Sequence, residues 1–116
     1  MSKKKESAKK VDAAVLERLY DVLVSRKDAD PATSYTAKMY AKGLTKIAQK
    51  VGEEGVETAL AAVAEGRDEL LNESADLLYM LLLLWAEKGV KPQEVFAILD
   101  QRFGTSGIRE PSGEKS

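Results

Sequence analysis

Apolar residues recur every three or four positions along most of this chain, which is the spacing of amphipathic helices. The first stretch predicts a helix from Val11 to about Arg26. Similar patterns predict four more helices, over residues 35–42, about 44–64, about 69–88 and 92–103. No segment alternates apolar and polar residues as a strand would. The predicted fold class is therefore all-α, with four to five helices forming a bundle.

The predicted helix ends coincide with residues that start or stop helices. Ser34 and Asp68 are candidate N-caps, and Pro92 suits the first position of the last helix. The Asp- and Pro-containing segment Lys27–Thr33 reads as a loop. Three glycines are placed to end helices: Gly43, Gly66 and Gly89.

One segment makes a prediction about assembly. Leu77–Ala86 contains ten residues without a charge, too short to span a bilayer but nearly three helical turns. A helix that is apolar on every side must be covered all round, and one small chain has few helices to do so. We therefore expect a homodimer of intertwined chains whose core is completed by dimerisation. A role on a membrane surface is the weaker alternative, because such a helix needs a polar face.

Charge divides the 116 residues into a basic start and an acidic remainder. Residues 1–10 carry five lysines and one glutamate, a charge of +4, so the rest carries −5 of the total of −1. We expect residues 1–10 and 105–116 to be mobile tails around one domain over 11–104. The basic tail could touch nucleic acid or anionic lipid, but a solubilising role is favoured, so neither partner is predicted. The start lacks an apolar signal-peptide core, which predicts a cytoplasmic location.

The sequence contains no cysteine and no histidine. This excludes disulfides, thiol nucleophiles, Cys/His zinc sites and His-based catalytic triads. Chemistry on this chain must use carboxylates, Lys or Arg, hydroxyls, backbone amides or an oxygen-ligated metal.

Carboxylates cluster in two of the predicted helices. At 100° per residue, Glu53, Glu54 and Glu57 occupy an arc of about 100° on one helix. Glu73 and Asp76 share a face of the next helix. A short connection favours antiparallel packing, which would bring the two groups face to face.

Two interpretations of this cluster remain open. It can be a solvated acidic face, with Lys50 paired to Glu54 one turn away. It can also be a metal site, since a hard divalent cation relieves the mutual repulsion, and Mg²⁺ is the usual choice where phosphates share the coordination. Lysines recur every four residues just upstream, as suits a polyphosphate ligand: Lys38, Lys42, Lys46 and Lys50. The combination indicates phosphoryl chemistry on a small nucleotide, without the glycine-rich motifs of the P-loop or dinucleotide folds.

The pattern Lys50-x-x-Glu53-Glu54-x-x-Glu57, followed by Glu73-x-x-Asp76, resembles the E-E-x-x-E…E-x-x-D signature of the all-α, MazG-like nucleoside triphosphate pyrophosphatases. The flanking residues narrow the resemblance to the phosphoribosyl-ATP pyrophosphatase family of histidine biosynthesis. They are Ser34–Lys38, Lys46–Glu54, Glu69–Tyr79 and Arg102–Ile108.

The resemblance implies Mg²⁺-dependent hydrolysis of the α–β phosphate bond of phosphoribosyl-ATP, giving phosphoribosyl-AMP and pyrophosphate. It implies that one of Glu53, Glu54 and Glu57 orients the attacking water, and that Lys50 and Lys46 contact phosphate. It also implies helical homodimers. The residues expected to hold Mg²⁺ are Glu53, Glu54, Glu57, Glu73 and Asp76.

Two alternatives differ in kind. The first is a house-cleaning pyrophosphatase for dUTP or another non-standard nucleotide, which would use the same metal cluster. The second is a helical dimerisation module without enzymatic activity, in which the acidic face only contacts solvent.

Overall fold

The computed structural model describes residues 10–103, and within that range it contains five α-helices, one 3₁₀ turn and no strand. The all-α prediction is thus confirmed. Both predicted tails lie outside the described residues, apart from Lys10. The elements are α2 (Ala14–Ser25), η1 (Arg26–Asp28), α3 (Tyr35–Lys42), α4 (Leu44–Ala64), α5 (Arg67–Lys88) and α6 (Pro92–Phe103).

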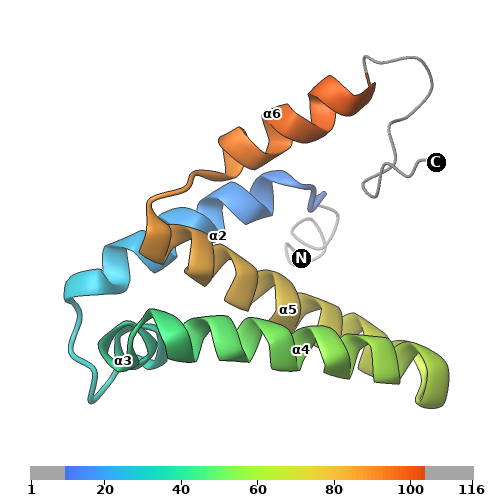
Figure 1. Cartoon of the computed structure of the whole chain (residues 1–116), viewed down its shortest axis with the longest axis horizontal. Coiled ribbons are helices and arrows are strands. Elements are labelled where there is room, and N and C mark those ends of the chain that lie inside the picture. Colours follow the sequence, from blue (N-terminus) through green and yellow to red (C-terminus); the bar gives the residue numbers. More distant parts are fainter. Residues whose placement is uncertain (1–9, 104–116) are drawn as a thin grey trace, which may run out of the picture.

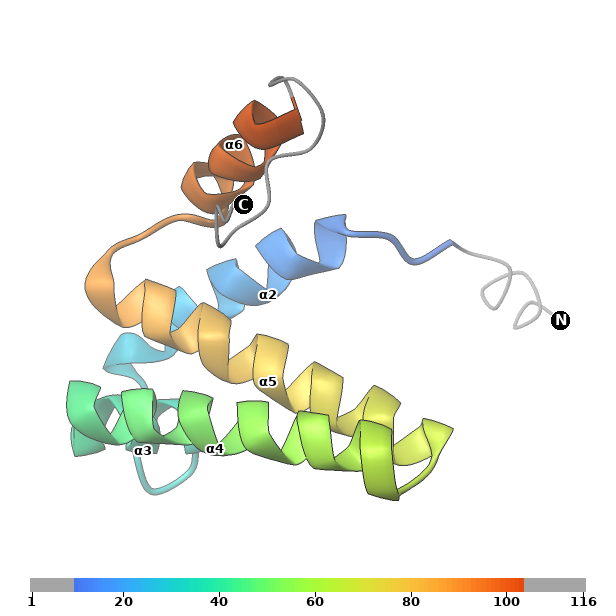
Figure 2. The ribbon, with the colours of Figure 1, turned by 45° about the vertical axis from the view of Figure 1, so that its right-hand side comes forward.

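The two longest helices, α4 and α5, form an antiparallel pair that runs the length of the molecule (Figure 1). Helix α2 packs on the other side of α5, and α6 lies beyond α2 and contacts it (Figure 2). The short helix α3 packs against the beginning of α4. Its Tyr40 hydroxyl donates a hydrogen bond to the Leu23 carbonyl oxygen at 2.8 Å, which connects α3 to α2.

The hydrophobic core lies where α2, α3, α4 and α5 meet. Burial of such large side chains stabilises the fold by about 1.5–3 kcal/mol each. The core draws on the first half of α4 and the second half of α5. The middle of the helix pair therefore lies outside this core cluster. Its buried members are Leu23, Met39, Ile47, Met80, Leu82 and Leu83.

Most helix ends fall where the sequence predicts them. The Ser34 side chain accepts a hydrogen bond from the Ala37 N–H at 3.1 Å, as an N-cap does. Gly43 and Gly89 adopt positive φ angles of 98° and 73° at their helix ends, a region that favours glycine. Pro92 opens α6.

Two helix starts were predicted wrongly, and the predicted loop includes part of a 3₁₀ turn. The first helix begins at Ala14 instead of Val11, and just before it the Asp12 side chain accepts the Ala14 N–H at 3.0 Å. The 3₁₀ turn η1 covers Arg26 and the first two residues of the predicted loop, Lys27 and Asp28. The N-cap of α5 is Gly66 instead of Asp68, and the Glu69 side chain accepts the Gly66 N–H at 3.2 Å.

The uncharged run in α5 is only partly covered by the described residues. Met80, Leu82, Leu83 and Ala86 are buried, whereas Leu78 remains exposed. Among the described helices, none combines the length and the apolar character needed to cross a bilayer.

Candidate active site

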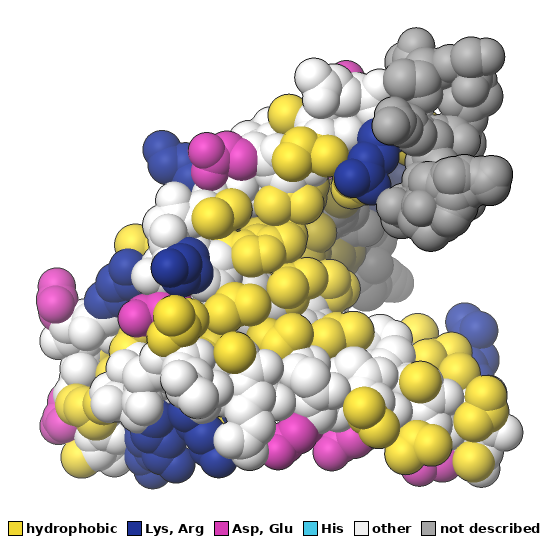
Figure 3. Space-filling model, in the orientation of Figure 1, with side chains coloured by type: hydrophobic (Ala, Val, Ile, Leu, Met, Phe, Trp, Pro, Cys, Tyr) yellow, Lys and Arg dark blue, Asp and Glu magenta, His cyan; other side chains and the backbone are white. Residues whose placement is uncertain are grey.

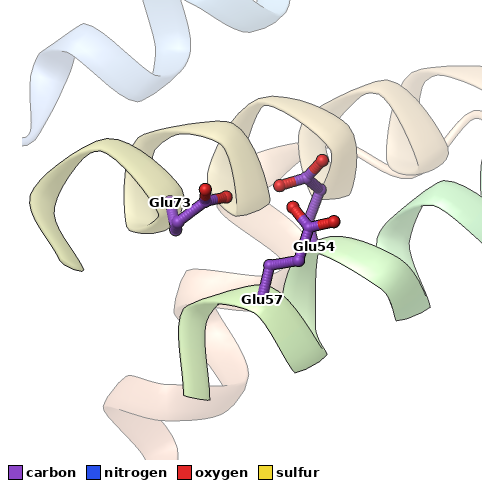
Figure 4. Close-up of side chains that lie close together, drawn as sticks. All are labelled: Glu54, Glu57 and Glu73. Atoms are coloured by element: carbon purple, nitrogen blue, oxygen red, sulfur yellow. The ribbon is translucent and has the colours of Figure 1, made fainter. Parts of the chain in front are cut away.

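Three carboxylates meet between the two long helices. Glu54 and Glu57 project from α4 and Glu73 projects from α5, and the three point toward one another (Figure 4). Each offers one carboxylate oxygen, and these oxygens all lie within 4.8 Å of one another. We call Glu54, Glu57 and Glu73 the acidic cluster.

The Thr58 hydroxyl connects the two helices next to the acidic cluster. The Thr58 hydroxyl lies 2.7 Å from the Glu54 carbonyl oxygen, in its own helix. It also lies 3.1 Å from the Glu73 carbonyl oxygen, in the facing helix. This contact fixes the register of α4 against α5 and places Glu73 opposite Glu54.

The acidic cluster holds polar atoms that residues 10–103 do not satisfy. Oε1 of Glu54 and Oε1 of Glu73 are buried and have no hydrogen-bond partner within that part of the chain. Burial, then hydrogen bonding with Glu54 and the charge of Glu57, raises the pKa of Glu73 to about 7. Burial also raises the pKa of Glu54, with the charge of Glu57 as the next cause. The chain thus holds carboxylates together against their repulsion, and a cation would relieve it.

Two of the five predicted metal ligands are not part of this closely spaced group. Glu53 accepts a hydrogen bond from the Gln49 side chain at 2.8 Å and pairs with Lys50 at 3.5 Å. The Gln49 hydrogen bond is the main cause that lowers the pKa of Glu53, and Lys46 also contributes. Asp76 lies near Glu54, whose pKa its charge helps to raise.

A pocket of about 360 Å³ opens beside the acidic cluster. Lysine and carboxylates form part of its lining, and two tyrosines form another part. The Tyr79 hydroxyl is hydrogen-bonded to the Thr36 hydroxyl, which joins α5 to α3. The lining residues are Tyr35, Lys50, Glu54, Asp76, Tyr79 and Met80.

Charge and periodicity predicted the acidic residues of this site but gave no role to its tyrosines. Tyr35 and Tyr79 stand in two of the segments that carry the family resemblance, and that was the only signal available for them. The pairing of Gln49 with Glu53 was visible as an i, i+4 spacing.

The donor set suits a hard divalent cation. It consists of oxygen atoms alone, two of them buried without partners, from residues held close by a rigid helix pair. Mg²⁺ binds such oxygen ligands and keeps positions for water and substrate phosphates.

Fold and site together define an all-α protein with a carboxylate centre suited to a divalent cation and a phosphorylated ligand. The chain belongs to the phosphoribosyl-ATP pyrophosphohydrolase family, whose model matches residues 16–103. This membership confirms the family resemblance found in the sequence, and the all-α superfamily is consistent with it.

Close relatives agree with this assignment. The phosphoribosyl-ATP pyrophosphatase of Paramagnetospirillum magneticum is 61% identical over 99 residues, covering 85% of this chain and 91% of the relative. That of Azospirillum brasilense is 55% identical over 107 residues, covering 92% and 96%. That of Rhodospirillum rubrum is 50% identical over 101 residues, covering 87% and 86%. The chain is accordingly a hydrolase, and the interpretation as a dimerisation module without activity loses its support.

Proposed function

We propose that this chain hydrolyses the α–β phosphate bond of phosphoribosyl-ATP with Mg²⁺, giving phosphoribosyl-AMP and pyrophosphate in histidine biosynthesis. The observation that carries the proposal is the acidic cluster with its unpartnered oxygens, in a chain of this family. In the reaction the oxygen of a water bonds to phosphorus as the anhydride P–O bond breaks. Pyrophosphate leaves with the electron pair of that bond, and the water proton passes to a carboxylate.

Five carboxylates are assigned to the metal in this proposal. Mg²⁺, when bound, polarises the phosphate and neutralises charge on the leaving pyrophosphate. Glu54, Glu57 and Glu73 would hold the ion, and Glu53 and Asp76 are the two further ligands that the proposal assigns to it. One of Glu53, Glu54 and Glu57 orients the attacking water and accepts its proton.

Lys50 is the best-placed cation for the substrate phosphates. It lines the pocket together with Glu54 and Asp76, and its pKa is raised chiefly by Glu53, so it stays charged at neutral pH. Lys46 lies one turn earlier on α4 and is the second phosphate contact in the proposal.

The substrate itself is tested by measuring pyrophosphate release from phosphoribosyl-ATP, dUTP and ATP in parallel, with and without a chelator. We expect release from phosphoribosyl-ATP alone, abolished when the divalent cation is removed. Release from dUTP in place of phosphoribosyl-ATP would keep the metal chemistry but support the house-cleaning alternative. No release from any of the three would overturn the proposed function.

We also infer a homodimer. Apolar side chains remain exposed on α4 and α6 beyond the core, with Val63 exposed to 81%. Hydrophobic side chains gather over α2 and α5, on part of α6 and at the end where α4 and α5 are joined (Figure 3). A second copy of the chain would cover this surface and the open side of α5. The exposed members on these elements include Val56, Leu60, Val63, Leu71, Leu78, Ile98 and Leu99.

Sedimentation velocity at micromolar concentration should therefore show twice the mass of the 12.7 kDa chain. Val63→Lys should shift the equilibrium toward the monomer, because it places a charge in the interface. A wild-type monomer under these conditions would contradict the inference.

In this proposal the ligand is a small phosphorylated nucleotide. We expect the chain to bind neither nucleic acid nor a membrane. Such a nucleotide does not cross membranes unaided, so we expect the reaction in the cytoplasm.

A further inference from the structure

The pocket beside the acidic cluster has two chemically different sides. Lys50, Glu54 and Asp76 supply charge from α4 and α5. Tyr35 and Tyr79 supply aromatic surface from α3 and α5. With a divalent cation held by the acidic cluster, as in the proposed function, the cation and Lys50 would favour a ligand that combines an anionic part with a planar, apolar part.

The two tyrosines are not equivalent. The Tyr79 ring is half-buried, and its hydroxyl is hydrogen-bonded to Thr36, which is itself buried. Tyr35 makes no such bond and keeps 52% of its surface exposed. The two ring centroids lie 6.3 Å apart at an interplanar angle of 37°, so Tyr79 supports Tyr35 as a neighbouring ring.

The position of Tyr35 is well defined despite its exposure. It is the first residue of α3, directly after Ser34, whose side chain caps the helix through the Ala37 N–H. It also lines the same pocket as Lys50. The ring thus stands next to the residue assigned to phosphate, at a fixed point of the backbone.

An exposed aromatic ring beside the lysine assigned to phosphate is placed to stack against the base of a nucleotide. Every base offers a flat π-face, and stacking on a tyrosine requires no hydrogen-bond pattern. A volume of about 360 Å³ lies within the range of small-molecule sites.

We propose that Tyr35 is the base-stacking residue of this hydrolase, against which the purine of the substrate lies while its phosphates reach Lys50 and the acidic cluster. The inference rests on the proposed function, because it takes the pocket as the place of a nucleotide. It adds a recognition residue on α3, outside the two helices that carry the carboxylates.

The test compares Tyr35→Leu, which removes the ring, with Tyr35→Phe, which keeps the ring and removes the hydroxyl. For each variant, KM and kcat are measured with phosphoribosyl-ATP, and the inhibition constant is measured with inorganic tripolyphosphate, which has phosphates but no base. Tyr35→Leu should raise KM about 10- to 100-fold with little change in kcat. It should leave tripolyphosphate inhibition within about twofold, and Tyr35→Phe should resemble the wild type.

Lys50→Gln is the contrasting variant. Because it removes a phosphate contact, it should weaken the binding of the substrate and of tripolyphosphate alike. Circular dichroism and the melting temperature check that each variant folds. The proposal is overturned if Tyr35→Leu leaves KM unchanged or weakens the binding of tripolyphosphate as much as that of the substrate. It is also overturned if Tyr35→Phe raises KM as much as Tyr35→Leu does. A wild type that does not hydrolyse phosphoribosyl-ATP at all would instead defeat the proposed function, so the two failures are distinguishable.

Discussion

Glu54→Gln should lower kcat for phosphoribosyl-ATP by about 10²–10³-fold while the helical fold survives. The substitution keeps the shape of the side chain but removes a negative charge from the centre of the acidic cluster. Loss of one charged metal ligand should raise the activation free energy by about 3–4 kcal/mol. At about 1.36 kcal/mol per tenfold change in rate, this corresponds to the expected factor. Steady-state kinetics at saturating Mg²⁺ measure the effect.

The same substitution should leave the melting temperature unchanged or raise it when no divalent cation is present. Burial and the charge of Glu57 already disfavour the ionised form of Glu54, so a neutral side chain relieves repulsion there. Glu65→Gln is the matched control, because Glu65 is an exposed glutamate at the end of the same helix. It should keep kcat within about twofold. Normal turnover by Glu54→Gln would show that the carboxylate is not part of the catalytic centre.

Removing divalent cations should abolish hydrolysis and make the stability of the chain depend on pH. The pKa of Glu73 is raised from 4.5 to about 7 in the folded chain, so the folded state binds more protons than the unfolded state between these values. Stability should therefore fall as pH rises from about 4.5 to about 7 and change little above that. Melting temperatures at pH 5 and pH 8, with a chelator, measure the difference.

Mg²⁺ should restore the stability lost at pH 8, because it binds the ionised carboxylates. At ten times its Kd the ion contributes about 1.4 kcal/mol. For a domain of about 100 residues this corresponds to an increase of about 6–11 °C in melting temperature. Glu73→Gln should weaken both the pH dependence and the Mg²⁺ effect. A wild-type chain that melts at the same temperature with and without Mg²⁺ at pH 8 would argue against a metal site formed before substrate binds.

The helices were predictable because their apolar spacing and their end residues agree. Leu44–Ala64 combines a helical pattern with a glycine on either side, and the structure places that helix between the same residues. The errors arose where a local side chain decides the boundary. The Asp12 side chain accepts the Ala14 N–H just before the first helix, and the Glu69 side chain accepts the Gly66 N–H. These hydrogen bonds depend on rotamers that periodicity does not contain.

The sequence predicted which charged residues form the site better than it predicted how their side chains are arranged. Helical spacing placed Glu54 and Glu57 on one face and correctly set Glu73 opposite them. It could not show that Glu53, at the edge of the same arc, accepts a hydrogen bond from Gln49 and forms an ion pair with Lys50. The aromatic side of the pocket was missed for a different reason. Tyr35 and Tyr79 are far apart in sequence, so only the packing of α3 against its neighbours brings them together.

The contact of the Thr58 hydroxyl with the Glu73 carbonyl has a consequence for variation in chain length. The two residues are 15 positions apart, and the turn between their helices lies within that interval. One residue inserted into either helix between Thr58 and Glu73 rotates everything beyond it by about 100° and would turn Glu73 away from Glu54. A residue added to the turn costs little, because closing a slightly longer loop changes the free energy only by a small amount. Insertions and deletions compatible with activity should therefore fall in the turn around Gly66 and not in the helical segments on either side of it.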